Sequence, residues 1–333
     1  MKPLTLSKWL STIFLLTVFL IAVIIFSVWV GAEKIDFLRF FQITSERDRD
    51  ILFYSRLPRL LLGAITGGAL SSAGAAYQSL LRNPLADPYT LGVSGGAALG
   101  SIFGMGLGLP FTLISLMAFM SALASMGLIY WIARLKGHLP AHTLLLTGAI
   151  FNAFCFAIIL FINSVVTIEQ VHQIIFFLIG SLSTESYQKI AVIGGFAGGG
   201  FFILMISSGR MNALSLGDET ALHLGVDVGR FRCFIFFAAS LMIGAVVSVC
   251  GLIGFVGLFI PHMVRLIWGA DHRLLIPASA LMGASFLTLS DTLARTLLTT
   301  SAYQTELPVG VITALLGGPF FVYLLKKQQR CLL

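Results

Sequence analysis

Ten long apolar runs dominate the sequence, and they restrict the possible fold more than any other feature. Each run is close to the ~20 residues that an α-helix needs to cross the hydrocarbon core of a bilayer. Hydrophobic residues make up 57% of the chain and charged residues only 11%, whereas a soluble domain carries about 25% charged residues. A water-soluble fold could not bury so much apolar surface. We therefore predict an all-α membrane protein, one transmembrane domain over residues 1–333 with ten spans at 9–30, 57–81, 90–108, 110–133, 141–163, 189–207, 231–249, 252–268, 274–297 and 308–325.

The first apolar run, Trp9–Val30, has two interpretations. Lys2 and Lys8 precede it, and Val30-Gly31-Ala32 resembles the cleavage site of a secretory signal peptide. The run is longer than the apolar region of about 7–15 residues that a signal peptide carries. We therefore expect a retained membrane span.

The positive charges lie at the ends of the apolar runs. If both termini are cytoplasmic, 13 of the 21 Lys and Arg residues lie inside and 8 outside. The positive-inside rule favours this orientation. The formal net charge of +7 could also indicate nucleic-acid binding, but no basic stretch carries interleaved aromatic residues. We expect lipid around the chain and no nucleic-acid partner.

Two stretches are rich in small residues. Residues 57–81 consist mostly of small side chains, which allow helix backbones to approach closely in lipid, so we expect a central helix packed on all sides. Gly92–Gly108 has glycine at seven positions. A phosphate-binding loop is an alternative for it, but the GxxxxGK[ST] lysine and a preceding strand are missing. Close helix packing explains the glycines better.

A polar stretch, Gly209–Arg232, separates two of the apolar runs. Ser215 and Asp218 have the spacing of a helix-starting capping box, and Leu222 and Val226 are four apart, which places them on one helix face. The pattern predicts two short helices joined by a glycine turn outside the membrane. Loops of more than about a dozen residues are usually functional, although a folded loop without a partner is the alternative.

Three separated motifs resemble the FecCD-type permeases, which are the membrane subunits of type II ABC importers for ferric siderophores, haem and cobalamin. The similar stretches run from about residue 10 to the C-terminus, in matching order and spacing, and the ten predicted spans agree with that fold. The motifs are RLPRLLLGAITGGALSSAGAAYQSLLRNPLADPYTLGVSGGAALG (56–100), GFVGLFIPHMVRL (254–266) and ELPVGVITALLGGPFF (306–321).

The resemblance implies partners and a path. It implies a second permease copy, two ATP-binding cassette ATPase subunits and an extracytoplasmic substrate-binding protein. The path would run between the two permease copies, lined by the spans at 141–163 and 308–325. Asn152 and Asn163 in the first of these could contact the substrate or hydrogen-bond a neighbouring helix. A cytoplasmic gate is expected, by position only, at 134–142.

The polar stretch corresponds to the family's coupling segment, which seats on the ATPase. A ligand-driven change needs contacts that differ between two states, and a short capped helix transmits displacement better than a loose loop. Each residue in this stretch could instead have only a local capping or turn role. The residues expected to contact the ATPase are Gly217, Asp218, Glu219, Leu222, Gly225 and Val226.

Three arginines, Arg56, Arg59 and Arg295, match family arginines that face acidic residues of the binding protein. Exposed ion pairs contribute only about 0–1 kcal/mol each, so these arginines would steer and orient the binding protein more than they would add to its affinity. Two alternatives stay open. Arg59 and Arg295 could simply anchor their spans at the membrane surface, and Asp291 could pair with Arg295 four residues later on one helix.

The chain shows no signature of chemistry of its own. Neither a Walker lysine, nor a nucleophile elbow, nor a zinc-binding helix is recognisable, and the six histidines and four cysteines are spread out. We therefore expect no enzymatic activity, catalytic residue, cofactor or metal site. An ion-coupled secondary transporter is the alternative function, although such proteins usually carry charged residues inside their spans.

Overall fold

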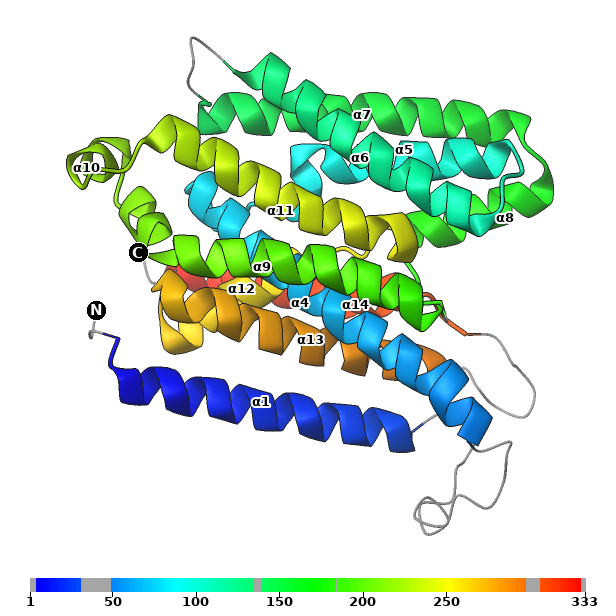
Figure 1. Cartoon of the computed structure of the whole chain (residues 1–333), viewed down its shortest axis with the longest axis horizontal. Helices are drawn as coiled ribbons and strands as arrows, with labels where there is room; N and C mark the ends of the chain where they lie inside the picture. The colour runs from blue at the N-terminus through cyan, green and yellow to red at the C-terminus, as the bar shows by residue number, and fades with distance from the viewer. Residues whose placement is uncertain (1–3, 31–48, 135–138, 184, 298–305, 331–333) are drawn as a thin grey trace.

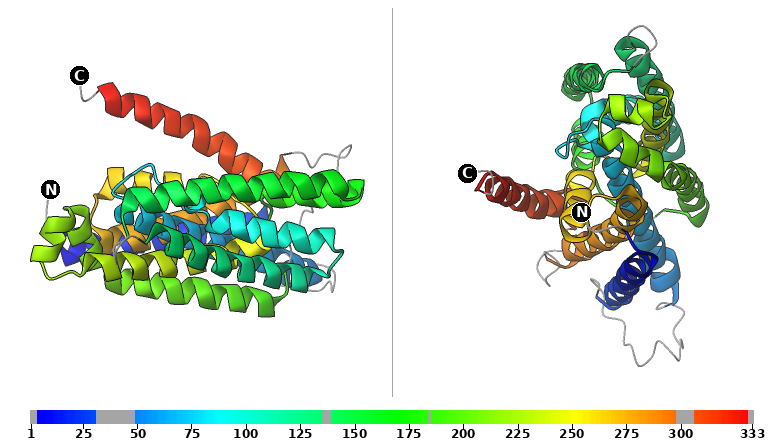
Figure 2. Two further views of the ribbon diagram at one scale, coloured as in Figure 1. Left: turned by 90° about the horizontal axis from the view of Figure 1, so that it is seen from above. Right: turned by 90° about the vertical axis from the view of Figure 1, so that its left-hand side faces the viewer.

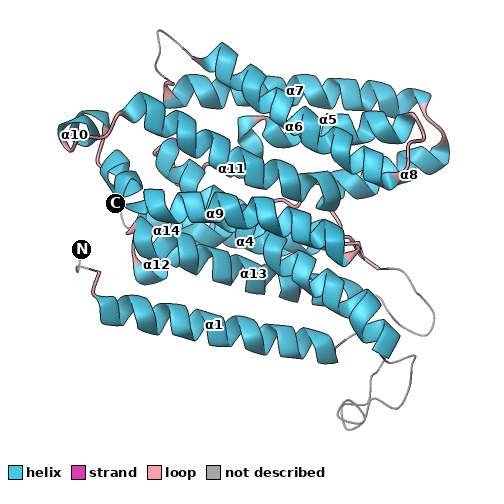
Figure 3. Ribbon diagram, in the orientation of Figure 1, coloured by secondary structure: helices cyan, strands magenta, loops and turns pink. Residues whose placement is uncertain are grey.

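The computed structural model describes residues 4–30, 49–134, 139–183, 185–297 and 306–330. Every regular element within these ranges is a helix, which confirms the predicted all-α fold (Figures 1 and 3). In chain order the helices are α1 (Leu6–Trp29), η1 (Ile51–Arg56), α4 (Leu57–Leu80), η2 (Pro88–Leu91), α5 (Val93–Gly106), α6 (Phe111–Ala133), α7 (Ala141–Val165), α8 (Ile168–Ile179), α9 (Tyr187–Ser215), α10 (Asp218–His223), α11 (Val228–Cys250), α12 (Val256–Trp268), α13 (His272–Thr296) and α14 (Val309–Arg330).

A helix is found at each of the ten predicted spans, but the helices differ in length. Seven are long and apolar enough to cross a membrane, namely α1, η1 with α4, α6, α7, α9, α11 and α13. The apolar helices α5 and α12 have 14 and 13 residues. At 1.5 Å per residue they cover about 20 Å of a hydrocarbon core that is about 30 Å thick. These two predicted spans are therefore partial, and α14 contributes a third shorter apolar stretch, Val309–Tyr323.

The breaks before α5 and α12 meet inside the bundle. The Tyr89 hydroxyl, in η2, accepts a 2.9 Å hydrogen bond from the backbone N–H of Ile253, just before α12. A Cβ on Gly257 would lie 2.4 Å from the Pro88 ring, so the two segments touch. Non-helical backbone at membrane depth is tolerated where protein buries it and satisfies its polar groups. Here Tyr89 satisfies the backbone N–H of Ile253 at the break before α12, and Asn152 and Ser94 satisfy the Tyr89 carbonyl at the break before α5.

Helix α4 is the centre of the bundle, as its small residues predict. It packs against α13, α9, α11 and α12, and most of its residues are buried. A Cβ on Gly67 would lie 2.2 Å from the Gly283 carbonyl oxygen, and one on Gly74 would lie 1.9 Å from that of Gly257. These contacts need glycine. Gly96 and Gly100 of α5 have the same explanation, since a Cβ at either position would overlap a serine of α6.

Helix α9 extends further than the sequence predicts. It continues to Ser215, although the apolar run ends at residue 207. The extension is stabilised because its polar residue Asn212 has partners at the start of α13. The Asn212 amide donates to Asp271 at 2.7 Å, and its oxygen accepts from the backbone N–H of His272 at 2.8 Å. The first residues of the polar stretch therefore belong to a long helix, not to a separate short one.

The second span begins earlier than predicted, at Ile51 instead of residue 57. Its first turn is the π-helix η1, which runs directly into α4. Pro58 follows this turn, has no N–H to donate, and its ring crowds the carbonyl four residues before it. The proline therefore favours the wider turn at this point.

The two ends of the bundle carry different features (Figure 1). One end, here called the α10 end, holds α10 together with the start of α1 and the end of α14. The other, the opposite end, holds α8 and the start of α9. Helix α14 projects from the body on the side where α7 lies (Figure 2). Both helices therefore offer surface that the rest of this chain does not cover.

Candidate functional site

Helix α10 is a short helix held between two glycine turns. Gly217 and Gly225 have φ angles of +124° and +79°, which L side chains rarely adopt. After the second turn the chain folds back, and the Val226 N–H bonds the Ala221 carbonyl at 2.9 Å. Ala221 is fully buried and Val226 is 8% exposed, so these two residues anchor the segment to the bundle.

Three leucines of this segment point away from the bundle. Leu216, Leu222 and Leu224 have exposed fractions of 69%, 58% and 61%. Leu222 belongs to α10, Leu216 and Leu224 flank this helix in the chain, and Figure 1 shows α10 at the tip of the α10 end. Several large apolar side chains that stay exposed on a segment outside the long apolar helices can mark a protein-binding surface. We call Leu216, Leu222 and Leu224 the leucine surface.

An ion cluster ties α10 to two other helices. One Asp218 carboxylate oxygen lies 2.9 Å from Arg82, just after α4, and 2.8 Å from Arg232 on α11. Arg232 is nearly buried, whereas Asp218 and Arg82 are about 40% exposed at their side chains. Arg82 also has a φ angle of +49°, and this left-handed conformation costs about 1–2 kcal/mol for a residue with a side chain.

A second charged cluster lies at the opposite end. Arg59 pairs with Asp291 at 3.0 Å and with Glu306 at 2.6 Å, and Arg295 pairs with the same Asp291 at 3.1 Å. The arginines are 12% and 8% exposed at their side chains and Asp291 is 2% exposed, whereas Glu306 is 49% exposed. Two guanidinium groups thus share one buried carboxylate, and the accessible member of the cluster is Glu306.

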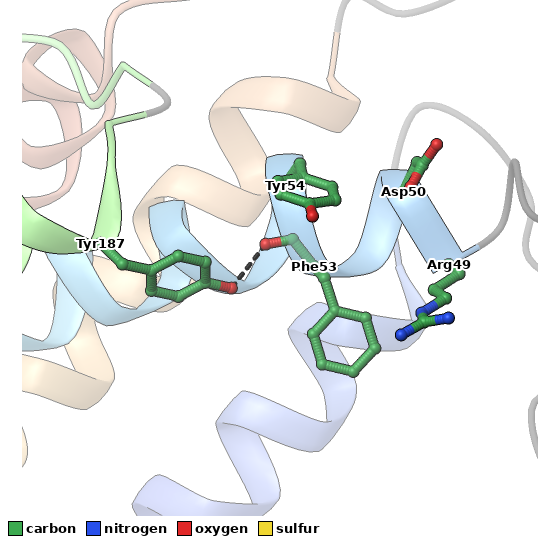
Figure 4. Close-up of a pocket in the computed structure, with 5 residues that line it drawn as sticks. All are labelled: Arg49, Asp50, Phe53, Tyr54 and Tyr187. Atoms are coloured by element: carbon green, nitrogen blue, oxygen red, sulfur yellow. Dashed lines mark hydrogen bonds between the residues drawn. The ribbon is translucent and has the colours of Figure 1, made fainter.

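Arg56 is also buried at this end. It is 3% exposed, and its guanidinium donates a 2.6 Å hydrogen bond to the Val28 carbonyl at the end of α1. The same turn borders a hollow of about 590 Å³, which Figure 4 shows. There the Tyr187 hydroxyl donates to the Phe53 carbonyl and so joins the start of α9 to η1. The other lining residues are Arg49, Asp50 and Tyr54.

The two asparagines of α7 have different surroundings. The Asn152 amide donates to the Tyr89 carbonyl, so it holds η2 against α7. Asn163 has a buried side-chain oxygen without a hydrogen-bond partner in the described part of the chain. Of the two roles predicted for Asn152, the structure shows the bond to a neighbouring segment. Substrate contact stays a prediction for both residues. The predicted gate at 134–142 includes 135–138, which are outside the described residues.

Comparison with known proteins supplies the decisive observation. The model of the FecCD transport family matches residues 18–327. The chain belongs to the FecCD transport family. This FecCD permease is 39% identical over 282 residues to the hemin transport permease HmuU of Yersinia pestis, and the alignment covers 82% of each chain. It is 40% identical over 277 residues to the cobalamin import permease BtuC of Halobacterium salinarum, which covers 82% of this chain and 73% of that one.

A solved structure agrees with this assignment. An inward-facing metal-chelate type ABC transporter matches with a TM-score of 0.84 at 28% identity, over 96% of this chain and 99% of that chain. The predicted resemblance is therefore confirmed, and the FecCD permease is a transport subunit of an ABC system. Family membership leaves no support for the ion-coupled secondary transporter considered from the sequence.

The structure corrects several details of the predicted coupling segment. The FecCD permease has one short helix between two long ones, not two short helices. Ser215 does not cap α10, because it ends α9 and donates to Met211 at 3.0 Å. Leu222 and Val226 do not share a face, since α10 ends at His223 and the Gly225 turn buries Val226. Val226 therefore cannot contact a partner in this conformation.

Other predicted residues are accessible, and some were missed. Glu219 and Gly225 are exposed together with Leu222, whereas Asp218 is occupied by two arginines. The sequence analysis does not single out Leu216 and Leu224, which the structure exposes. Each of these leucines directly precedes a turn glycine, which is a signal that could have identified them. At the opposite end, the predicted alternative that Asp291 pairs with Arg295 is confirmed.

Proposed function

We propose that this FecCD permease carries an iron chelate, haem or cobalamin into the cytoplasm while a separate ATPase hydrolyses ATP. Relatives named for hemin and for cobalamin have nearly the same identity to this chain, 39% and 40%. The supported substrate class is therefore a large metal chelate or metallated macrocycle. Which member of the class is carried depends on a binding protein.

The leucine surface is the observation that carries this proposal. Two ATPase subunits, one under each permease copy, would cover Leu216, Leu222 and Leu224, and Glu219 would lie at the polar rim. Because Ala221 and Val226 pack into the bundle, a displacement of α10 is transmitted to α9 and α11. The permease itself supplies no chemistry in this scheme, and its conformation follows that of the ATPase.

The charged cluster at the opposite end would receive the binding protein. In the free permease Glu306 holds Arg59 from the solvent side. An acidic residue of the binding protein can replace Glu306 on Arg59, while Asp291 keeps both guanidinium groups in position. Arg56 and Arg295, which are buried at the same end, add positive charge to this site.

The path would form between two copies of this chain, as a homodimer. Helix α7 exposes large apolar residues along its length, among them Ile150, Phe154 and Phe161, and α14 exposes Leu315 and Leu316. Both helices lie on one side of the body (Figure 2). A second copy packed against this side would enclose a path lined by α7 and α14, with Asn152 and Asn163 on one wall.

The α10 end would face the cytoplasm, in the cytoplasmic membrane. The described start of α1 and the end of α14 both lie at the α10 end (Figure 1), so both termini would be cytoplasmic. This orientation places 13 of the 21 Lys and Arg residues inside, in agreement with the positive-inside rule.

Ligand titration of the binding protein encoded with this permease tests the substrate class. Cyanocobalamin, haemin and a ferric siderophore are titrated separately, and the ligand that binds is then offered to vesicles holding the complete transporter. The proposal expects ATP-dependent accumulation of one of these ligands. Binding and uptake of a small sugar, an amino acid or a free metal ion, with none of the three chelates bound, would contradict it.

A further inference from the structure

Arg82 occupies a position that normally belongs to glycine. Helix α4 ends with the Asn83 N–H bonded to the Gln78 carbonyl at 3.1 Å and the Arg82 N–H to the Ser79 carbonyl at 3.2 Å. This is the Schellman arrangement, in which the residue with positive φ is usually glycine. Strained backbone of this kind persists where the surrounding structure fixes it, and it often accompanies function.

The Arg82 side chain spans from the end of α4 to the first residue of α10. Its guanidinium meets Asp218 at 2.9 Å and passes beside Gly217, where a Cβ would lie 3.8 Å from the guanidinium, an ordinary van der Waals distance. Asp218 also neutralises the nearly buried Arg232. The cluster therefore fixes α10 to the end of α4 in addition to the chain connections through Gly217 and Gly225.

The segment that follows Arg82 is short and internally bonded. The Ala86 N–H bonds the Asn83 carbonyl at 3.1 Å, and the Asn83 side chain accepts from the Leu85 N–H at 2.9 Å. Asp87 in turn caps η2 through the Tyr89 N–H at 3.2 Å. Two prolines further restrict this backbone. Residues 82–89 can therefore move as one unit.

Tyr89 lies at the other end of this unit and contacts two further elements. Its carbonyl accepts from Asn152 on α7, and its hydroxyl accepts from the Ile253 N–H before α12. Ser94 at the start of α5 bonds the same carbonyl at 3.2 Å. One bonded segment thus reaches from α10 to the helix that would line the path.

We infer that Arg82 and Tyr89 are positioning residues that transmit the displacement of α10 to α7 and to the break before α12. The inference rests on the proposed role of α10 as the ATPase contact. It assigns the strained Arg82 a role beyond neutralising Asp218, since a glycine at this position would end α4 without strain. It also assigns Asn152 to transmission, through its bond to Tyr89.

The test uses Arg82→Gly, which removes the guanidinium and relieves the backbone. Nitroxide labels are placed at Ser164→Cys near the end of α7 in both copies, in a background without the four native cysteines, and the transporter is reconstituted with its ATPase in nanodiscs. The measurements are the melting temperature, the Kd for the ATPase, the ATPase rate, and the change in label distance when ATP is trapped with vanadate. Arg230→Ala is the matched control, because Arg230 is 92% exposed at its side chain and, among the described residues, its ion pair is with the nearby Asp227.

For Arg82→Gly we expect an unchanged or higher melting temperature, a Kd and an ATPase rate within twofold of the native values, and at least a twofold smaller distance change. Arg82→Lys should restore part of this change, and Arg230→Ala should retain all of it. Tyr89→Phe, which removes only the hydroxyl, should also reduce it. A full distance change in Arg82→Gly and Tyr89→Phe would overturn the inference.

Two further outcomes separate this inference from the proposed function. A Kd for the ATPase that rises tenfold or more in Arg82→Gly would make Arg82 a direct ATPase contact and would also overturn the positioning role. Leu222→Asp is measured in parallel. If Leu222→Asp leaves the Kd unchanged, the proposed role of α10 fails, whatever the result for Arg82.

Discussion

The exposed area of the leucine surface allows us to predict how strongly it contributes to ATPase binding. Burying a whole leucine side chain stabilises by about 1.5–3 kcal/mol. The three leucines are 58–69% exposed, so covering them would contribute about 1 kcal/mol each, or about 3 kcal/mol together. Replacing Leu216, Leu222 and Leu224 by alanine should therefore raise the Kd for the ATPase about 100-fold, since 1.4 kcal/mol is a factor of ten. The melting temperature should change little, because these side chains make few contacts within the permease.

The assay is titration of the fluorescently labelled ATPase onto the permease in nanodiscs. The matched control is a triple alanine variant of leucines on α6, Leu113, Leu116 and Leu128, which are 43–54% exposed along the membrane span. The control should bind the ATPase as the native permease does. Equal Kd values for the two triple variants, with both proteins folded, would refute the assignment of α10 as the ATPase contact.

Three further predictions concern packing and charge. Gly74→Ala should lower the melting temperature, because its Cβ would lie 1.9 Å from the Gly257 carbonyl oxygen and overpacking costs about 1–3 kcal/mol. Gly198→Ala is the control and should leave the melting temperature unchanged, because its Cβ would enter open space. Equal melting temperatures for the two variants would contradict the close helix contact. Tyr77→Phe should cost about 1 kcal/mol in urea unfolding, because it breaks the buried 2.6 Å bond to Ser240; an unchanged midpoint would contradict this estimate. Glu306→Gln should strengthen docking of the binding protein in a binding assay, because residue 306 then no longer competes for Arg59. Asp291→Asn should weaken docking and destabilise the fold by about 3–5 kcal/mol. Weaker docking of Glu306→Gln would contradict the replacement of Glu306 by an acidic residue of the binding protein.

The sequence predicted the helices better than their ends. The central position of α4 follows from small residues such as Gly67 and Gly74, because their spacing depends only on close contact between helices. The shortness of α5 and α12 was not predictable. Hydropathy cannot distinguish a helix from an apolar segment whose backbone is broken, and Tyr89 and Ile253 satisfy each other only once the chain is folded.

The candidate site was predicted in location but not in detail. The polar stretch identified the α10 end, yet periodicity placed Leu222 and Val226 on one face and could not foresee that the turn at Gly225 buries Val226. The charges showed the same limit. Asp291 was recognised as a partner of Arg295, but its bond to Arg59 joins helices 232 residues apart in the chain and leaves no local signal.

Uptake into sealed vesicles shows whether this subunit moves substrate only when an ATPase moves α10. The permease is reconstituted in three ways with the ligand that its binding protein selects: alone, with the active ATPase, and with an ATPase whose Walker lysine is replaced. Vesicles without ATPase also receive an imposed proton or sodium gradient. We expect uphill accumulation only with the active ATPase and ATP. Accumulation against a gradient by the permease alone, or with the inactive ATPase, would contradict it.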